Sequence, residues 1–114
     1  MKRNKPADIE DARTVFDKPI DIQKQDEDTE LWGTVQHLHA EVNKAGGTEN
    51  FAAHADQFHA RLQFKVKYFP GIGQIRDAPT LFRILYNSEQ YQVIDYDDYR
   101  ERHRIVRIVG ERYD

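Results

Sequence analysis

The chain has 114 residues, enough for one domain with a modest core and too few for a second. Hydrophobic residues make up 39% and charged residues 32%, and the net charge of −3 does not indicate a basic nucleic-acid-binding protein. The absence of cysteine excludes a disulfide scaffold, a thiol nucleophile and a cysteine-ligated zinc. No segment has the apolar length of a signal peptide or a membrane span, so we expect a cytoplasmic protein without a membrane partner.

The chain is predicted to begin with an arm and an edge strand. Residues 1–13 are polar, which favours a flexible N-terminal arm, and residues 14–114 are expected to form a single domain. The next apolar side chains fit a strand: Val15, Phe16, Ile20 and Ile22. Pro19 interrupts or bends it, as edge strands tolerate, and the polar residues 23–30 are expected to form a loop.

A second strand is predicted over residues 31–42, LWGTVQHLHAEV. Neither alternating face is cleanly apolar, so we expect a kink, which Gly33 can supply. Residues 43–60 follow as a short helix or a long mobile loop, because Gly46 and Gly47 are flexible and Thr48 can cap a helix.

The stretch LQFKVKYFPGI, residues 62–72, gives the clearest strand signal. One set of alternating side chains is apolar and is expected in the core: Leu62, Phe64, Val66 and Tyr68. Lys65 and Lys67 lie on the other face, where exposed lysines also block edge pairing, and Pro70 and Gly71 end the strand.

Three further strands are predicted after an irregular connection over residues 73–82. Strands at 81–86 and 91–96 flank a tight turn, and a charged turn at 96–102 leads to a last strand at 103–109. The fold is therefore expected to be mainly β, a small antiparallel β-barrel or sandwich of about six strands, with one short helix or long loop excursion between the second and third strands.

Groups that could carry chemistry are few. The histidines are His37, His39, His54, His59 and His103. His37 and His39 share a strand face, but the sequence places no third ligand, so we expect solvated histidines and no metal site. Asp95, Asp97 and Asp98 lack the spacing of a calcium-binding loop and are expected in a solvated turn.

Catalysis is not indicated by any motif. Ser88 has no nucleophile-elbow motif around it, and the GIG at residues 71–73 lacks the context of a phosphate-binding loop. We therefore expect no enzyme and no cofactor.

The order of the motifs resembles the phage head-tail joining proteins, also called head closure, stopper or head completion proteins. The resemblance rests on KPIDIQ at 18–23, Trp32, Ala40 with Val42, FKVKYFPGI at 64–72, RILYNSEQYQVI at 83–94 and an acidic turn, a basic pair and a final strand at 94–111. It covers nearly the whole chain beyond residue 13. Two residues depart from the family pattern, since Lys67 stands where arginine is usual and Ser88 where glycine is usual.

The resemblance implies a subunit that is monomeric when free and forms a ring in the virion neck. Its partners would be the portal-adaptor and tail proteins of the same phage, further copies of itself and, in passing, packaged double-stranded DNA. The ring would close the channel and dock the tail, without catalysis or a cofactor, after a stage in the host cytoplasm.

Two sets of residues are candidates for assembly contacts. Residues 43–60 are expected to change conformation on assembly and to approach the channel lumen, with these candidates: Lys44, Gly46, Gly47, Glu49, Phe51, His54 and Asp56. Lys65 and Lys67 form the candidate interface surface.

Three alternatives remain open. One is a tail-completion or minor tail protein. Another is a small nucleic-acid-binding β-barrel, whose salt-dependent affinity for DNA would fall when Lys65 and Lys67 are changed to glutamate. The last is an enzyme of unknown type.

Overall fold

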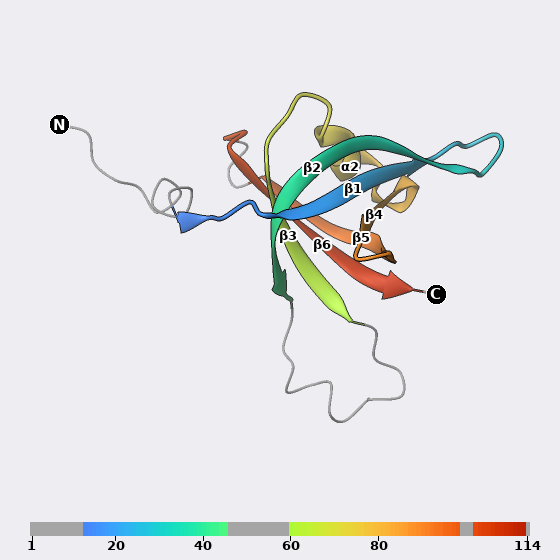
Figure 1. Cartoon of the computed structure of the whole chain (residues 1–114). Helices are drawn as coiled ribbons and strands as arrows, with labels where there is room; N and C mark the ends of the chain where they lie inside the picture. Colours follow the sequence, from blue (N-terminus) through green and yellow to red (C-terminus); the bar gives the residue numbers. More distant parts are fainter. Residues whose placement is uncertain (1–12, 46–59, 99–101, 114) are drawn as a thin grey trace.

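The alternating segments of the sequence form six antiparallel strands that close into a barrel. The computed structural model describes residues 13–45, 60–98 and 102–113 (Figure 1). Its elements are β1 (Lys18–Gln25), β2 (Trp32–Lys44), β3 (Arg61–Lys67), α2 (Gly73–Asp77), the 3-10 turn η3 (Pro79–Leu81), β4 (Phe82–Tyr86), β5 (Glu89–Asp98) and β6 (Ile105–Tyr113). Around the barrel the strands follow the order β1-β2-β3-β6-β5-β4, and β4 pairs back to β1.

The barrel is held together by one apolar cluster. Its buried members are Ile20, Ile22, Ala40, Phe64, Val66, Ile72, Ile75, Phe82, Ile84, Tyr91, Val93, Val106 and Ile108. Phe64 and Val66 have no exposed surface, as their alternation along residues 62–68 predicted. The ring of Phe64 makes edge-to-face contacts with Tyr86 and Tyr91, with centroid separations of 5.9 and 5.6 Å.

Two β-bulges bend the strands. Val35 is the extra residue of β2, because Gln36 pairs with Ile22 while Thr34 pairs with Gln23. Ile94 is the extra residue of β5, between Val93 and Asp95. A bulge shifts the alternation of side chains by one position, which explains why neither face of residues 31–42 reads as cleanly apolar. The expected kink exists, but it lies at Val35 and not at Gly33.

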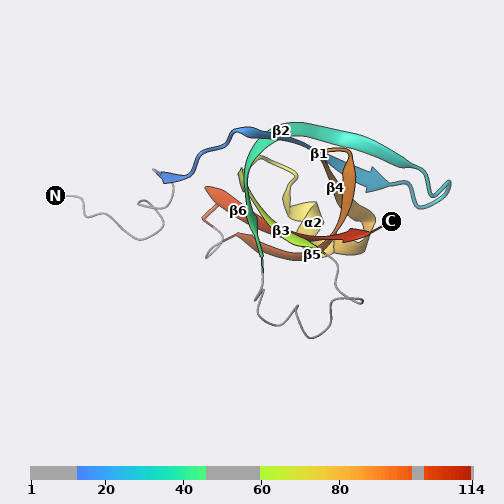
Figure 2. The ribbon, with the colours of Figure 1, turned by 60° about the horizontal axis from the view of Figure 1, so that its bottom comes forward.

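The connection between β3 and β4 is more regular than predicted. It contains α2 and η3, although the sequence analysis expected an irregular segment over residues 73–82. Ile72 and Ile75 are three residues apart and each is 1% exposed, so one side of this short helix joins the core. Figure 2 shows α2 within the outline of the strands.

The predicted fold class is confirmed, with corrections at several element boundaries. β1 starts at Lys18 and continues to Gln25, so the predicted loop is reduced to residues 26–31. β5 extends to Asp98, so its last residues are not part of the predicted turn. Most of the predicted excursion after β2, residues 46–59, and nearly all of the predicted arm lie outside the described residues.

The hairpin of β1 and β2 projects from the barrel. β2 has 13 residues, but β3 pairs only with its last four, Glu41–Lys44. The preceding part of β2 therefore pairs with β1 alone, as the β1–β2 ribbon. β1 itself also pairs with β4 over Asp21–Lys24, so only the tip of the ribbon extends beyond the body (Figures 1 and 2).

Candidate assembly surface

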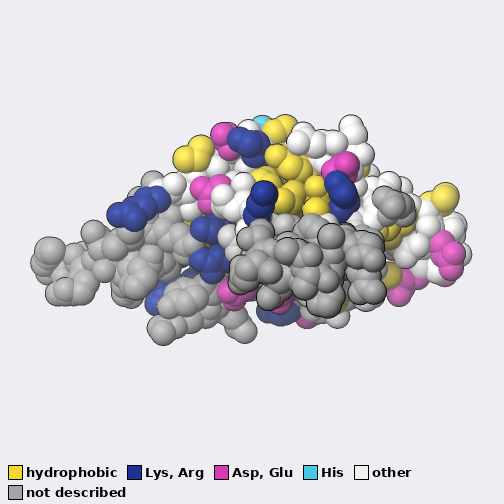
Figure 3. Space-filling model, turned by 90° about the horizontal axis from the view of Figure 1, so that it is seen from below, with side chains coloured by type: hydrophobic (Ala, Val, Ile, Leu, Met, Phe, Trp, Pro, Cys, Tyr) yellow, Lys and Arg dark blue, Asp and Glu magenta, His cyan; other side chains and the backbone are white. Residues whose placement is uncertain are grey.

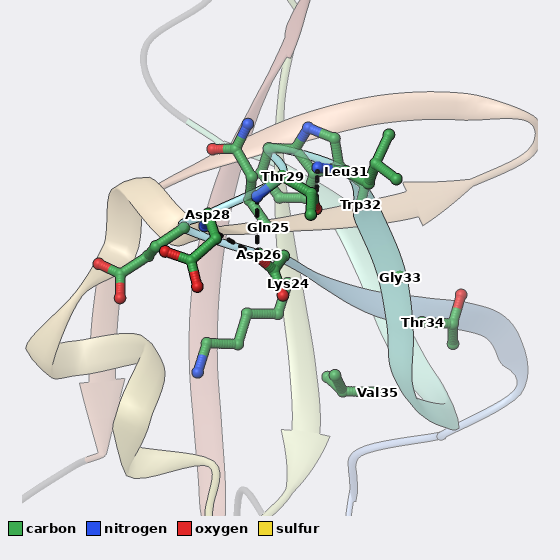
Figure 4. Close-up of a pocket in the computed structure, with 11 residues that line it drawn as sticks. Lys24, Gln25, Asp26, Asp28, Thr29, Leu31, Trp32, Gly33, Thr34 and Val35 are labelled. Carbon is green, nitrogen blue, oxygen red and sulfur yellow. Dashed lines mark hydrogen bonds between the residues drawn. The ribbon is translucent and has the colours of Figure 1, made fainter.

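The tip of the β1–β2 hairpin is fixed by Asp26. Its Oδ1 accepts hydrogen bonds from the backbone N–H groups of Asp28, at 2.8 Å, and Thr29, at 2.9 Å (Figure 4). These backbone donors, Thr29 first, lower the pKa of the Asp26 carboxyl. Glu30 has a left-handed backbone, with φ 62°, and closes the loop through its N–H on the Asp26 carbonyl. The tip is therefore an ordered loop that carries acidic side chains.

A surface hollow of about 600 Å³ lies at this tip, and only hairpin residues line it, from Lys24 to Val35. Leu31 and Val35 of the hairpin are 70% and 55% exposed. Single exposed aliphatic side chains are common on protein surfaces, but these two lie at one projecting tip, which makes the tip a candidate contact surface.

Arg83 anchors the hairpin to β4 close to the tip loop. Its guanidinium lies 4.3 Å above the centroid of the Trp32 ring, and its Nε donates to Gln23 Oε1 at 2.7 Å. Nη1 also donates to the hydroxyl of Tyr113 at 3.1 Å. A planar guanidinium can make both kinds of contact at once. Trp32 and Arg83 belong to separate motifs of the sequence, and their contact was not predicted from it.

A row of charges crosses the outer face of four strands. The strand register aligns Glu41 of β2, Lys65 of β3, Arg107 of β6 and Asp97 of β5. Lys65 pairs with Glu41 at 3.7 Å and Arg107 with Asp97 at 3.8 Å. The side chain of Lys65 is only 13% exposed. Lys65 therefore points outward, as predicted, but the prediction that it is exposed is wrong.

The other candidate residues have different surroundings. Lys67 is exposed, and its ammonium lies 5.4 Å from the centroid of the Phe16 ring. Lys44 is exposed at the end of β2, opposite Leu62. The remaining candidates of the 43–60 segment lie outside the described residues: Gly46, Gly47, Glu49, Phe51, His54 and Asp56. Their role stays a prediction.

Asp98 corrects the expectation of a fully solvated acidic turn. It is 8% exposed and accepts from the backbone N–H of His103 at 3.0 Å, while its second oxygen lies 2.6 Å from His103 Nδ1. His103 has a left-handed backbone, with φ 59°, and stacks on Tyr68 at 4.2 Å between ring centroids. Asp98 therefore fixes the chain where it enters β6, because a buried carboxylate needs such donors. Asp95 and Asp97 are exposed, as predicted.

Burial is also the main cause of a raised pKa at Tyr96, on β5. It raises the pKa of Tyr96 to about 12, and the negative charge of Asp98 adds to the effect.

His37 and His39 lie on the same face of β2, where they are opposite Asp21 and Pro19. His37 Nδ1 is hydrogen-bonded to the carboxylate of Asp21. Among the described residues, no three histidine or acidic side chains come together as a metal site. In the same part of the chain, no helix is long and apolar enough to cross a membrane.

These features indicate a protein that acts through contacts with other proteins. The described surface combines a small rigid barrel, a projecting hairpin with exposed aliphatic side chains, and paired charges of both signs. Such a surface suits specific contacts with other proteins.

Comparison with known proteins identifies the family. The sequence matches the phage head completion protein family over residues 6–112. The chain belongs to this family, which confirms the resemblance seen in its motifs and assigns it a structural role in assembly of the phage head, with other phage proteins as partners.

The fold has a counterpart of low sequence identity. The solution structure of protein SF1141 from Shigella flexneri 2a matches with a TM-score of 0.58 and 16% identity, over 88% of this chain and 95% of that one. This likeness shows a shared fold. No curated protein matches the sequence.

Proposed function

We propose that this protein is a head-tail connector subunit that completes the phage head. It forms a ring below the portal-adaptor complex in the virion neck, retains the packaged DNA and docks the tail. The observation that carries the proposal is the match to the head completion family across residues 6–112. The protein acts by assembly and by obstruction of the channel, with no catalysis and no cofactor.

The charge distribution supports a subunit that retains packaged DNA without binding it tightly. The chain has a net charge of −3. Lysines and arginines alternate with acidic side chains on the described part of the face in Figure 3, and Lys65 is already paired with Glu41. A protein with this surface releases few counterions on DNA, so tight non-specific binding is not expected. Contact with DNA would be made in passing, when the ring closes the channel.

During assembly, some segments of the subunit would become ordered by binding to neighbouring subunits or to other phage proteins. We assign this role to residues 43–60, including Lys44, and to the N-terminal arm. Lys67, with the paired Lys65, is the candidate contact on the barrel. Ordering a segment on binding costs conformational entropy, so a free subunit can stay monomeric until a partner surface offsets that cost.

A joining assay tests the function. Purified full-length protein is mixed separately with DNA-filled, tail-less heads and with free tails of the phage that encodes it. We expect binding to heads, retention of DNA, and recovery of infectivity when tails are then added. Binding to tails but not to heads would show a tail-completion protein, and binding to neither would overturn the proposal.

A DNA-binding assay distinguishes the proposed function from the nucleic-acid-binding alternative. We expect weak affinity for double-stranded DNA that Lys65→Glu with Lys67→Glu hardly changes. Tight, salt-dependent binding that this double variant loses would favour the nucleic-acid-binding alternative.

A further inference from the structure

The first part of β2 has an open strand edge. One side of β2 pairs with β1 from Trp32 to Ala40, but β3 pairs only with Glu41–Lys44 on the other side. Within the described residues, no strand pairs with that other side of residues 32–39. Alternate residues of an antiparallel strand direct their N–H and C=O groups away from the existing partner. The edge therefore offers a row of backbone donors and acceptors to a further strand.

This edge lacks the charges that usually prevent strand addition. Residues 32–39, WGTVQHLH, contain no lysine, arginine, aspartate or glutamate, and six of the eight are exposed. Exposed edges of monomeric proteins commonly carry lysine or inward-pointing charges against unwanted pairing. An uncharged edge of this length suits a partner strand.

A pocket of about 290 Å³ lies beside the edge, between the β1–β2 ribbon and the segment that leads into α2. Val35 of the edge lines it, and its other apolar lining includes Ile22, Phe69, Ile72 and Phe82. Alternate side chains of an added strand would point toward this side of the ribbon. The pocket can receive one aliphatic side chain from such a strand.

The same chain carries a segment suited to this edge. Residues 14–17 lie outside the strands of this structure, and Val15 is 58% exposed. The segment contacts side chains of β2 and β3: the N–H of Val15 donates to the Glu41 carboxylate at 3.3 Å, and the Lys67 ammonium lies 5.4 Å from the centroid of the Phe16 ring. These contacts do not place the segment in a strand ladder of its own subunit, so its backbone can pair with another strand. β-branched and aromatic residues such as Val15 and Phe16 favour extended structure.

A subunit cannot place this segment on its own edge. The segment precedes β1 and lies at the opposite end of the molecule from the hairpin tip (Figures 1 and 2). Gln36 is opposite Ile22, and Ile22 is seven positions after Val15, which in a strand is about 23 Å. If this segment occupies the edge, it therefore comes from a second copy.

We propose that residues 14–17 of one subunit add as a strand to the β2 edge of the next, with Val15 in the pocket beside Val35. Charge complementarity supports this occupant, because Arg13 precedes the donor segment and Asp17 within it is neutralised by Lys18 at 3.2 Å. The hairpin loop carries four carboxylates: Asp26, Glu27, Asp28 and Glu30. The contact joins opposite ends of identical subunits, and a head-to-tail contact of this kind builds a ring when the rotation between neighbouring subunits closes. The inference rests on the proposed function and identifies the contact between its subunits.

Cysteine cross-linking tests the contact, since the natural chain has no thiol. The test variant is full-length protein with Val15→Cys and Val35→Cys. The matched control carries Val15→Cys and Ile94→Cys, because Ile94 is also the exposed extra residue of a β-bulge, at 42% exposure. Both variants are oxidised mildly in concentrated solution and in joined particles, and circular dichroism checks that each is folded.

We expect a ladder of covalent oligomers for the test variant that is at least ten times stronger than for the control. Equal ladders, or no ladder in either setting, would overturn the strand addition. If the test variant joins heads to tails normally under reducing conditions but forms no specific ladder on oxidation, the strand addition is wrong and the proposed function stands. A specific ladder in solution from protein that joins no heads to tails would contradict the proposed function and leave the subunit contact standing.

Discussion

The turn between β4 and β5 depends on two residues in the left-handed region. Asn87 and Ser88 have φ values of 52° and 64°, as a two-residue type I′ turn requires. Asparagine tolerates this conformation, but a serine Cβ is strained there by roughly 1 kcal/mol. Glycine would adopt this conformation without strain, which agrees with the glycine that the resemblance to the family implies at this position.

Ser88→Gly should raise the free energy of unfolding by about 0.5–1 kcal/mol, since the relief of strain exceeds the added entropy of an unfolded glycine. Urea denaturation measures the change. Ser88→Ala keeps a Cβ and should change stability by less than the glycine variant. A lower stability for Ser88→Gly would contradict the assigned strain.

Gly110 lies where the barrel has no room for a side chain. A Cβ at this position would lie 2.8 Å from Tyr91 Cβ and 3.3 Å from Phe64 Cε2. Gly110→Ala should therefore destabilise the protein by about 1–3 kcal/mol, as overpacking of a core does. Gly33→Ala is the matched control, because a Cβ there has no neighbour within 4 Å. Thermal unfolding that ranks the two variants as equal would refute this packing argument.

Tyr96 gives the protein a predictable response to alkaline pH. Its pKa is raised from 10.0 to about 12 in the folded state, so folding favours the neutral phenol. That contribution to stability is complete below about pH 10 and is lost as the pH rises through about 12. Tyr96→Phe cannot ionise, and its free energy of unfolding should decline less over this interval. Urea denaturation at several pH values checks this, and parallel curves for the two proteins would count against it.

At the scale of elements, the sequence predicted all six strands, because a period of two is visible wherever one face is buried. Residues 62–68 are the clearest case, since no bulge interrupts them and Phe64 and Val66 enter the core. β2 was harder, because Val35 shifts the alternation and most of the ribbon is exposed on both faces. The short helix α2 was missed, since its five residues give too little periodicity.

The candidate surface was predictable only in part. Trp32 and Arg83 are 51 positions apart, so their contact depends on the register of β1 with both β2 and β4. That register is a tertiary property which the sequence pattern does not contain. The outward direction of Lys65 followed from alternation, but its pairing with Glu41 required the neighbouring strand.

The Arg83 contact gives a direct optical test of the hairpin anchor. Trp32 is the only tryptophan, so its fluorescence reports on the hairpin alone. Arg83→Ala should shift the emission to longer wavelength and lower the free energy of unfolding by about 1–2 kcal/mol, through loss of the cation–π contact and two hydrogen bonds.

Arg61→Ala is the control for charge, since Arg61 pairs with Glu111 and does not contact the indole in this structure. Arg83→Lys keeps the charge but not the planar guanidinium, so its emission should lie between those of the parent protein and the alanine variant. Unchanged emission in Arg83→Ala would show that the hairpin does not need this anchor.

At the scale of the whole molecule, the barrel closes without most of the segment between β2 and β3. Its flanks are already held, because the N–H of Ala45 donates to the carbonyl of Arg61 at 3.1 Å and that of Arg112 to the carbonyl of Ala60 at 2.8 Å. Each neighbouring strand also pairs with the body on its other side. We therefore expect the stability of the barrel to be separable from assembly into a connector.

Replacement of residues 46–60 by Asn-Gly tests that separation, since Ala45 is opposite Arg61 and this pair would then close a two-residue turn. This dipeptide favours a tight antiparallel turn, so the variant should fold as a monomer with cooperative unfolding and the near-ultraviolet circular dichroism of the parent. It should nevertheless fail to join heads to tails, because the segment proposed to order against neighbours is gone. A second variant keeps the parent length but carries Gly and Ser residues throughout 46–59. It separates the effect of losing the sequence of this segment from the effect of shortening the chain. Infectious, DNA-filled particles from the Asn-Gly variant would disprove the assembly role of this segment, and an unfolded variant would disprove the independence of the barrel.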